Sequence, residues 1–358
     1  MSWPIAYDCM RGAMMAQCLW LLQHVQMSRV YHYIRGQSMI KLYVLIGMVE
    51  IFDKLMCSFG QDALDSLYWS TMRSKKRLTL LNFVIVCIQS TLHSLLLFVH
   101  ITTLTVAVNS SDQALLTLLI SNNFAEIKSA VFKKFDKQNL FQLSCHDIVE
   151  RFKLILFLGM IMLLNIAHGG DDHLLAQFLN IFFLVFGGEV LADWIKHAFI
   201  TKFNMLQPSL YEEYSMILAR DITSCRKDDD NILDHTHLVA RRLAFATLPL
   251  NCVMIRFLQI AAPRLRSYLP AVSPARLATI AALFYLIALA AKLLTGMLLM
   301  AHSYTLQCDA SGGGGGGGAR ASPLPRSPAP GGHKSRKELS LEKLSTIARF
   351  TLWRGRIV

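Results

Sequence analysis

Long apolar stretches alternate with short polar segments along most of the chain. A helix that crosses a bilayer needs about 20 predominantly apolar residues. The stretches that reach this length are residues 80–108, 174–200, 243–262 and 277–301. The shorter or more interrupted stretches are residues 13–30, 39–52 and 154–167. This pattern predicts an all-α, polytopic membrane helix bundle of about five to seven spans, in which 39–52 and 154–167 can also be interfacial or re-entrant.

Basic residues gather in the polar segments and indicate the orientation of the spans. They lie in residues 128–153 and 202–242 and in the tail, whereas the link at 168–173, "HGGDDH", is short and acidic. Since cytoplasmic loops carry an excess of lysine and arginine, we expect two hairpins that enter from the cytosol after residue 109 and a cytosolic tail.

The stretch 80–108 is basic at both flanks, although a single span cannot have both ends in the cytosol. Two alternatives stay open: the stretch folds as a re-entrant hairpin, or the basic residues 73–77 lie on the other side. Asn109 begins an N-glycosylation sequon, Asn-Ser-Ser, which is usable only on the luminal side.

Apolar residues recur at three- and four-residue steps in the segment "SNNFAEIKSAVFKKF", residues 121–135, and lysines hold its polar side or its end. This pattern predicts an amphipathic helix. It can lie in the membrane surface with its lysines toward anionic headgroups, or pack against other cytosolic helices. The residues of the predicted surface helix are Phe124, Ile127, Lys128, Val131, Lys133, Lys134 and Phe135. We expect interfacial helices across 115–150 and 203–242.

The tail changes composition sharply. Residues 309–336 contain seven consecutive glycines and a proline-rich run, which predict a disordered linker between a transmembrane domain at 1–308 and the last segment. Residues 337–358 regain apolar residues at helical spacing, so we expect a short docking motif there. The motif residues singled out are Arg349, Phe350, Trp353 and Arg356.

Composition supports the membrane assignment and narrows the function. Hydrophobic residues make up 53% of the 358 residues and charged residues 17%, against about 25% in soluble domains. The net charge is +12, but no zinc-finger or RNA-binding signature accompanies it, so we expect no nucleic-acid partner. The eight cysteines form no CxxC pair and are expected to be free thiols.

Motifs of catalysis or cofactor binding are not found in the sequence, which lacks GxSxG, HExxH, P-loop and dinucleotide fingerprints. The acidic runs at 168–173 and 228–237 have no metal-ligand spacing and are interpreted as solvated loops. We therefore expect no enzyme activity, no cofactor and no metal.

Charged residues inside the apolar stretches are the strongest candidates for a functional site. A charge within the bilayer costs a few kcal/mol, so such residues usually face the bundle interior and pair. The expected network consists of Glu189, Asp193, Lys196, Arg256 and Lys292. It is either a polar path for an ion or small molecule, with Glu189 and Asp193 opposite Arg256 and Lys292, or a set of structural ion pairs.

Several blocks resemble those of the transmembrane anterior posterior transformation protein family. They are "YHYIRGQSMIKLYVLIGMVEIFDKLMCSFGQDALDSLYW" at 31–69, "LLTLLISNNFAEIKSAVFKKFDKQNLFQLSCHDIVERF" at 115–152, "WIKHAFITKFN" at 194–204, "YEEY" at 211–214, "ARRLAFATLPLNCVMIR" at 240–256 and the closing "ARFTLWRGRIV" at 348–358. The resemblance covers nearly the whole chain outside the glycine- and proline-rich tract.

The resemblance implies a non-enzymatic, multi-pass membrane protein of the endoplasmic reticulum. Fungal relatives act with a SUN-like-domain membrane protein to protect newly made proteins, and animal relatives are linked to trafficking, cilium formation and skeletal patterning. We therefore expect a scaffold or adaptor in protein folding quality control, with the lipid bilayer and a SUN-like-domain protein as partners. An ion or small-molecule channel or transporter that uses the intramembrane charges is the alternative.

Overall fold

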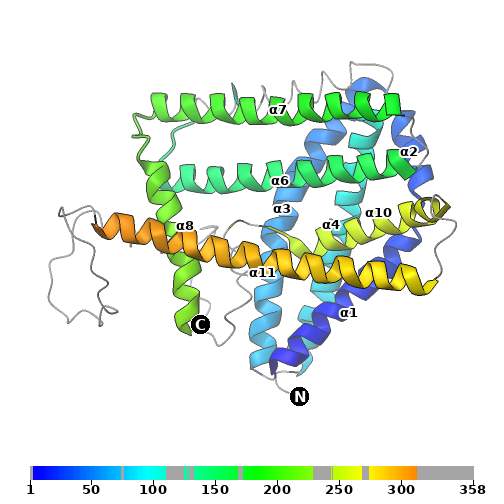
Figure 1. Ribbon diagram of the computed structural model, residues 1–358, viewed down its shortest axis with the longest axis horizontal. Coiled ribbons are helices and arrows are strands. Elements are labelled where there is room, and N and C mark those ends of the chain that lie inside the picture. The colour runs from blue at the N-terminus through cyan, green and yellow to red at the C-terminus, as the bar shows by residue number, and fades with distance from the viewer. Residues whose placement is uncertain are drawn as a thin grey trace. The chain divides into compact units, whose positions relative to one another are not determined.

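The computed structural model describes residues 3–73, 76–109, 125, 127–128, 133–167, 172–228, 243, 245–267 and 274–312. Within these residues the regular structure is helical and contains no strand (Figure 1). The predicted all-α class is therefore confirmed. The chain divides into two compact units: Met1–Lys134, Leu143–Phe203 and Leu243–Ala271 form the first, and Phe135–Gln142, Asn204–Arg242 and Val272–Val358 form the second.

The first unit contains most of the helices. They are α1 (Trp3–Gln23), α2 (Met27–Arg35), α3 (Met39–Met72), α4 (Lys76–Val108), α6 (Lys137–Ala167, from Leu143 onward), α7 (Asp172–Phe203) and α10 (Thr247–Ser267). The stretch 13–30 was expected to form one span, but α1 ends at Gln23 and α2 starts at Met27. The break contains the polar residues His24 and Gln26, and the His24 ring bonds the Trp20 carbonyl at 2.9 Å.

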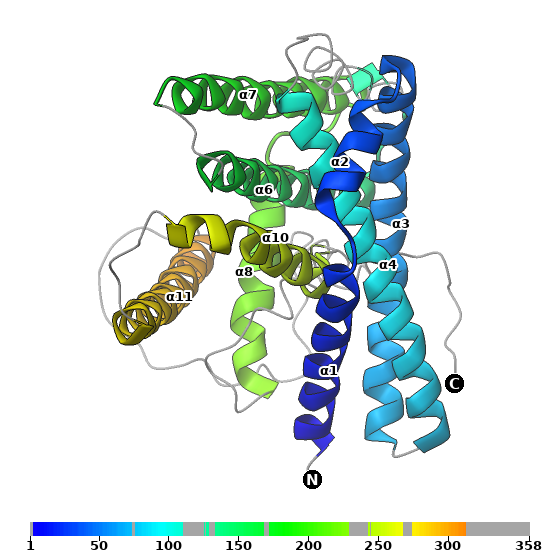
Figure 2. The same ribbon diagram turned by 90° about the vertical axis from the view of Figure 1, so that its right-hand side faces the viewer.

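Helices α3 and α4 form a long antiparallel pair (Figures 1 and 2). Polar side chains of α4 bond across it: Asn82 donates to the Ser66 carbonyl at 3.1 Å, and Gln89 donates to the Met56 carbonyl at 3.0 Å. The Gln89 amide lies against Gly60, where a methyl group would overlap it. These bonds set the register of the pair, and Gly60 permits the close approach.

The apolar core of the first unit surrounds α4, with α1 and α10 packed on it. Its fully buried side chains include Met14, Cys18, Leu22, Leu97, Phe98 and Phe257. The rings of Phe98 and Phe257 lie 5.3 Å apart. Although α4 is apolar enough to span a membrane, half of its most apolar window is buried within the protein. It is therefore a central helix of the unit.

Residues 80–108 were expected to form either a re-entrant hairpin or a span with basic residues at both ends. They lie within a single uninterrupted helix, so the re-entrant hairpin is excluded. At the end of α4, the Asn109 amide exchanges hydrogen bonds of 3.3 and 3.2 Å with the Asn165 amide on α6. The side of the membrane on which this sequon residue lies stays a prediction.

Three helices among the described residues are long and apolar enough to cross a membrane: Lys76–Val108, Phe178–Phe203 and Ala278–Asp309. They correspond to three of the four strongest predicted spans. The fourth, 243–262, lies mostly in α10 and contains Arg256 and Gln259, which lower its hydropathy. A span in α10 and the total of five to seven spans stay predictions.

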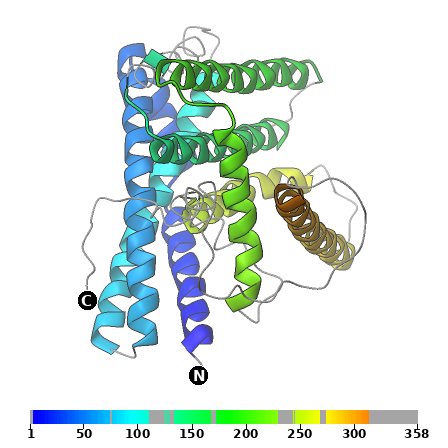
Figure 3. The same ribbon diagram turned by 90° about the vertical axis from the view of Figure 1, so that its left-hand side faces the viewer.

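The second unit contains α8 (Leu210–Asp228) and α11 (Pro274–Gly312), which pack on each other (Figures 1 and 3). Gln307 of α11 donates a hydrogen bond of 2.7 Å to Thr223 of α8. The Tyr214 hydroxyl donates to the Lys137 carbonyl at 2.7 Å. Helix α11 continues past residue 308, where the transmembrane domain was expected to end. That domain, 1–308, contributes to both units, and the linker and tail motif lie outside the described residues beyond Gly312.

Buried charge networks as the candidate functional site

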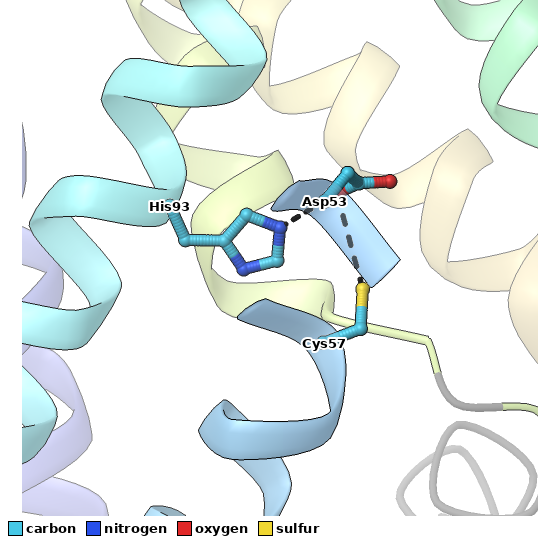
Figure 4. Close-up of side chains that lie close together, drawn as sticks. All are labelled: Asp53, Cys57 and His93. Atoms are coloured by element: carbon cyan, nitrogen blue, oxygen red, sulfur yellow. Dashed lines mark hydrogen bonds and ion pairs between the residues drawn. The ribbon is translucent and has the colours of Figure 1, made fainter. Parts of the chain in front are cut away.

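Asp53, near the middle of α3, is the centre of a buried polar cluster that joins three helices. Its Oδ1 accepts a hydrogen bond of 2.8 Å from His93 Nε2 of α4, and its Oδ2 lies 2.6 Å from Lys153 Nζ of α6. Cys57, one turn further along α3, places its Sγ 3.9 Å from Asp53 Oδ1 (Figure 4). We call Asp53, Cys57, His93 and Lys153 the α3 cluster.

A second buried cluster joins α6 to α7, which run side by side (Figure 1). Asp147 of α6 is fully buried and lies 3.0 Å from Lys196 Nζ and 2.8 Å from His197 Nε2. Lys196 also lies 2.8 Å from Asp193, which lies 3.3 Å from Arg151 Nε of α6. We call Asp147, Arg151, Asp193, Lys196 and His197 the α7 cluster.

Helix α6 supplies both clusters because its polar residues follow the helical period. Glu150 and Lys153 are three residues apart and face α3, whereas Asp147 and Arg151 are four residues apart and face α7. Residues three or four apart share a face of a helix. The spacing therefore gives α6 two polar faces, each matched by charges on a neighbouring helix.

At the rim of the α3 cluster, Glu150 and His146 of α6 are half-buried and Lys54 of α3 is exposed. Glu150 lies 3.2 Å from Lys54 of α3 and 3.0 Å from His146. Burial by itself would raise the pKa of the Glu150 carboxyl, but the hydrogen bond from His146 and the charge of Lys54 outweigh it and lower the pKa to about 2. Glu150 is therefore ionised wherever the protein is folded near neutral pH.

The α3 cluster has the residue types of a metal site but not its electrostatics. The ligand atoms of Asp53, Cys57 and His93 lie within 4.8 Å of one another. However, Lys153 Nζ lies 2.6 Å from the Asp53 carboxylate and 3.8 Å from Cys57 Sγ. An ammonium group there supplies the positive charge that a metal ion would bring, and it repels a second cation. The arrangement fits a buried salt bridge that connects three helices better than it fits a metal centre.

The residues of the predicted network are placed differently from one another. Asp193 and Lys196 lie in the α7 cluster, and Glu189 is a half-buried residue of the same helix. These residues belong to α7, which pairs with α6. The sequence had instead predicted that Glu189 and Asp193 lie opposite Arg256 and Lys292. Arg256 instead lies 3.4 Å from the carbonyls of Gln23 and Val25, at the end of α1. Lys292 belongs to α11 of the second unit.

Several residues of the two clusters were missed by sequence reasoning. They are Asp53, Cys57, His93, Asp147, Arg151 and Lys153. The predicted stretch 39–52 stopped just before Asp53, but α3 continues to Met72. A signal was present: an acid with apolar residues before and after it at helical spacing predicts a buried charge in need of a partner.

The predicted surface helix falls mostly outside the described residues. Ile127 and Lys128 have helical backbone, Lys133 and Lys134 are exposed, and the Phe135 amide donates to Asn204 Oδ1 at 2.8 Å. Phe124 and Val131 lie outside the described residues, as do Arg349, Phe350, Trp353 and Arg356 of the tail motif. Both roles therefore stay predictions.

Comparison with known proteins assigns the family. Residues 2–308 match the family described as "Eukaryotic membrane protein family". The chain belongs to this family. Its relatives include transmembrane anterior posterior transformation protein 1 of Mus musculus, which is 42% identical over 256 residues, 70% of this chain and 45% of that protein. The protein TAPT1 homolog of Drosophila melanogaster is 42% identical over 257 residues, 70% of this chain and 38% of that protein.

The chain matches less than half the length of these curated relatives. No solved structure matches it. The comparisons thus establish a eukaryotic membrane protein that is similar to the transmembrane anterior posterior transformation proteins, as the sequence blocks predicted. The two buried clusters lie inside the matched region 2–308.

Proposed function

We propose that this protein is a non-enzymatic, multi-pass scaffold or adaptor of the endoplasmic reticulum membrane. It holds a SUN-like-domain membrane protein, the partner class that the family resemblance implies, and thereby supports protection or folding of membrane and secretory proteins and their trafficking. In animals the same role serves cilium formation. The tail lies in the cytosol and its last residues, 337–358, dock a partner or the protein's own cytosolic face.

One observation carries the choice of a scaffold. Five side chains with a formal charge are buried in the described part of the chain: Asp53, Asp147, Lys153, Asp193 and Lys196. Each has a partner of opposite charge within 3.3 Å. Charges that neutralise one another between helices hold a bundle in one arrangement, whereas a conduction path needs polar groups that are free to exchange with a passing ion. This supports a rigid membrane frame.

The test is affinity purification of the full-length protein in mild detergent, followed by mass spectrometry of what co-purifies. A version without residues 337–358 is purified in parallel, and Trp353→Ala with Arg356→Ala forms a milder variant of the motif. A stoichiometric SUN-like-domain membrane protein is the expected result, with loss of that partner in both tail variants. Purification of the full-length protein alone, or only with itself, would contradict the adaptor role.

A channel or transporter is the second candidate, favoured by one observation. Asp53, His93 and Lys153 are titratable groups buried against α4, a helix apolar enough to span the membrane. Glu189→Gln and Arg256→Gln separate the two functions. An adaptor keeps its partner as long as the variant folds, whereas a conduction path loses flux in reconstituted vesicles at normal expression. No flux from the wild-type protein above empty vesicles would dispose of this candidate.

A further inference from the structure

The first unit contains an apolar pocket of about 520 Å³ between α1, α3 and α4. Its walls include Ala6, Met10, Thr71, Lys76, Leu80 and Phe83. The volume lies within the range of about 300–1,000 Å³ that is usual for small-molecule sites. The Thr71 hydroxyl is used inside α3, where it donates to the Leu67 carbonyl at 2.8 Å. Apart from the hydroxyl of Thr79 and the ammonium group of Lys76, the remaining side chains of the pocket wall are apolar or weakly polar.

The pocket has a charged end and an apolar end along α4. Lys76 is the first residue of α4, and Leu80 and Phe83 follow at steps of four and three residues on the same face. With about 1.5 Å of rise per residue, Phe83 lies roughly 10 Å deeper along the helix than Lys76. Since the candidate span starts at Lys76, the cation lies where the membrane surface would be, and the apolar end lies within the hydrocarbon.

The charge around the pocket entrance suits an anion. Arg73, Lys76 and Arg77 are exposed, and none of them forms an ion pair with any residue that the structure describes. No carboxylate is among the pocket's lining residues. The backbone amides at the start of α4 add the positive end of a helix dipole at the same place. A basic pocket beside membrane helices is a recognised way to hold an anionic lipid headgroup.

We propose that this pocket binds one anionic glycerophospholipid, with an acyl chain between α1 and α4 and the phosphate at Lys76. The occupant follows from the polarity of the pocket. An acyl chain needs no hydrogen-bond partner along the apolar wall, whereas a peptide strand would leave backbone groups unsatisfied there. The site is separate from both charge clusters and goes beyond the scaffold role, because it gives the protein a preference for anionic membranes.

Photolabelling in reconstituted vesicles tests the proposal. The full-length protein is placed in phosphatidylcholine vesicles that contain either phosphatidylserine or phosphatidylcholine with a photoreactive acyl chain. We expect labelled peptides to include Leu80 and Phe83, with a preference for the serine lipid. Lys76→Gln should reduce that preference about fivefold, the ratio expected for one lysine near a headgroup. Ala6→Phe fills the pocket and should remove labelling of these peptides with either lipid.

Matched controls separate the pocket from the general lipid annulus. Lys41→Gln changes an exposed cation of α3 that does not line the pocket, and it should leave the preference unchanged. Thermal unfolding in detergent checks that Ala6→Phe is folded, and Lys76→Gln changes an exposed residue, so one test survives if the first variant is unstable. Equal labelling by both lipids, labelling that persists in folded Ala6→Phe, or capture of a protein segment or second copy at Leu80 and Phe83 would overturn the proposal.

Discussion

The α3 and α7 clusters both neutralise buried charges between helices, but they distribute those charges differently. In the α3 cluster a single carboxylate, Asp53, receives His93 and Lys153 from two other helices. The α7 cluster spreads its charge over two carboxylates, and Asp147 and Asp193 share Lys196 while His197 and Arg151 flank them. A cluster that depends on one carboxylate should lose most of its stabilising interactions when that residue is replaced. A shared network should redistribute its bonds, so we expect the two clusters to differ in tolerance.

The largest effect is expected from Asp53→Asn. The amide still accepts one hydrogen bond, but Lys153, nearly buried, loses its only described carboxylate. An uncompensated buried charge costs about 3–5 kcal/mol of unfolding free energy. Denaturant or thermal unfolding in detergent micelles, followed by tryptophan fluorescence, measures the loss. The double variant Asp53→Leu with Lys153→Met should recover much of it, because an apolar pair of similar volume replaces a buried ion pair at little cost. No recovery would contradict the electrostatic explanation.

A smaller loss is expected from Lys196→Met in the α7 cluster. Asp147 keeps His197, and Asp193 keeps its ion pair with Arg151, so each carboxylate retains one basic neighbour. The remaining cost is that of charged hydrogen bonds left unmade, about 1.5–3 kcal/mol. The same unfolding measurement compares it with Asp53→Asn. If Lys196→Met proved the more damaging of the two, the contrast between a single centre and a shared network would be wrong.

The close packing of α3 against α4 brings His93 within hydrogen-bond distance of Asp53. A substitution at Gly60 tests this packing. A methyl group there would displace the buried Gln89 amide, which bonds the Met56 carbonyl. Overpacking of this kind costs about 1–3 kcal/mol. Gly47→Ala is the matched control in the same helix, because nothing lies within 4 Å of its added methyl group. We expect that control to be stabilising by about 0.5–1 kcal/mol. Equal effects at the two glycines would argue against a tight helix pair.

The smallest effect on stability is expected at the rim of the α3 cluster, and it is measured through the dependence of stability on pH. The folded state lowers the pKa of Glu150 from 4.5 to about 2, so its contribution is fully present above about pH 4.5 and is lost as the pH falls toward 2. Glu150→Gln should flatten stability between these values. Lys54 is 43% exposed, and Lys54→Ala should cost under about 1 kcal/mol at neutral pH. A stability curve of Glu150→Gln that falls as steeply as that of the wild type would assign the acid sensitivity to other carboxylates.

Sequence patterns were most informative where helices are apolar over their whole length. The stretches 80–108 and 277–301 both lie within helices that are long and apolar enough to span a membrane. Prediction was weakest at residues 39–52, where Asp53 and Lys54 suggested an end. A helix continues through a charge when a distant side chain neutralises it, and the partners of Asp53 lie 40 and 100 residues away in the chain. No local window contains that information.

The sequence alone determined the helical class, the strongest apolar helices and the family, because hydrophobic length and characteristic blocks are local properties of the chain. It also contained the spacing that gives α6 two polar faces. Only the tertiary structure decided which charges meet. Asp193 and Lys196 were expected opposite Arg256 and Lys292, yet their partners are Asp147 and Arg151. Buried charges pair according to which helix faces are in contact, and those contacts depend on packing along the whole length of the helices.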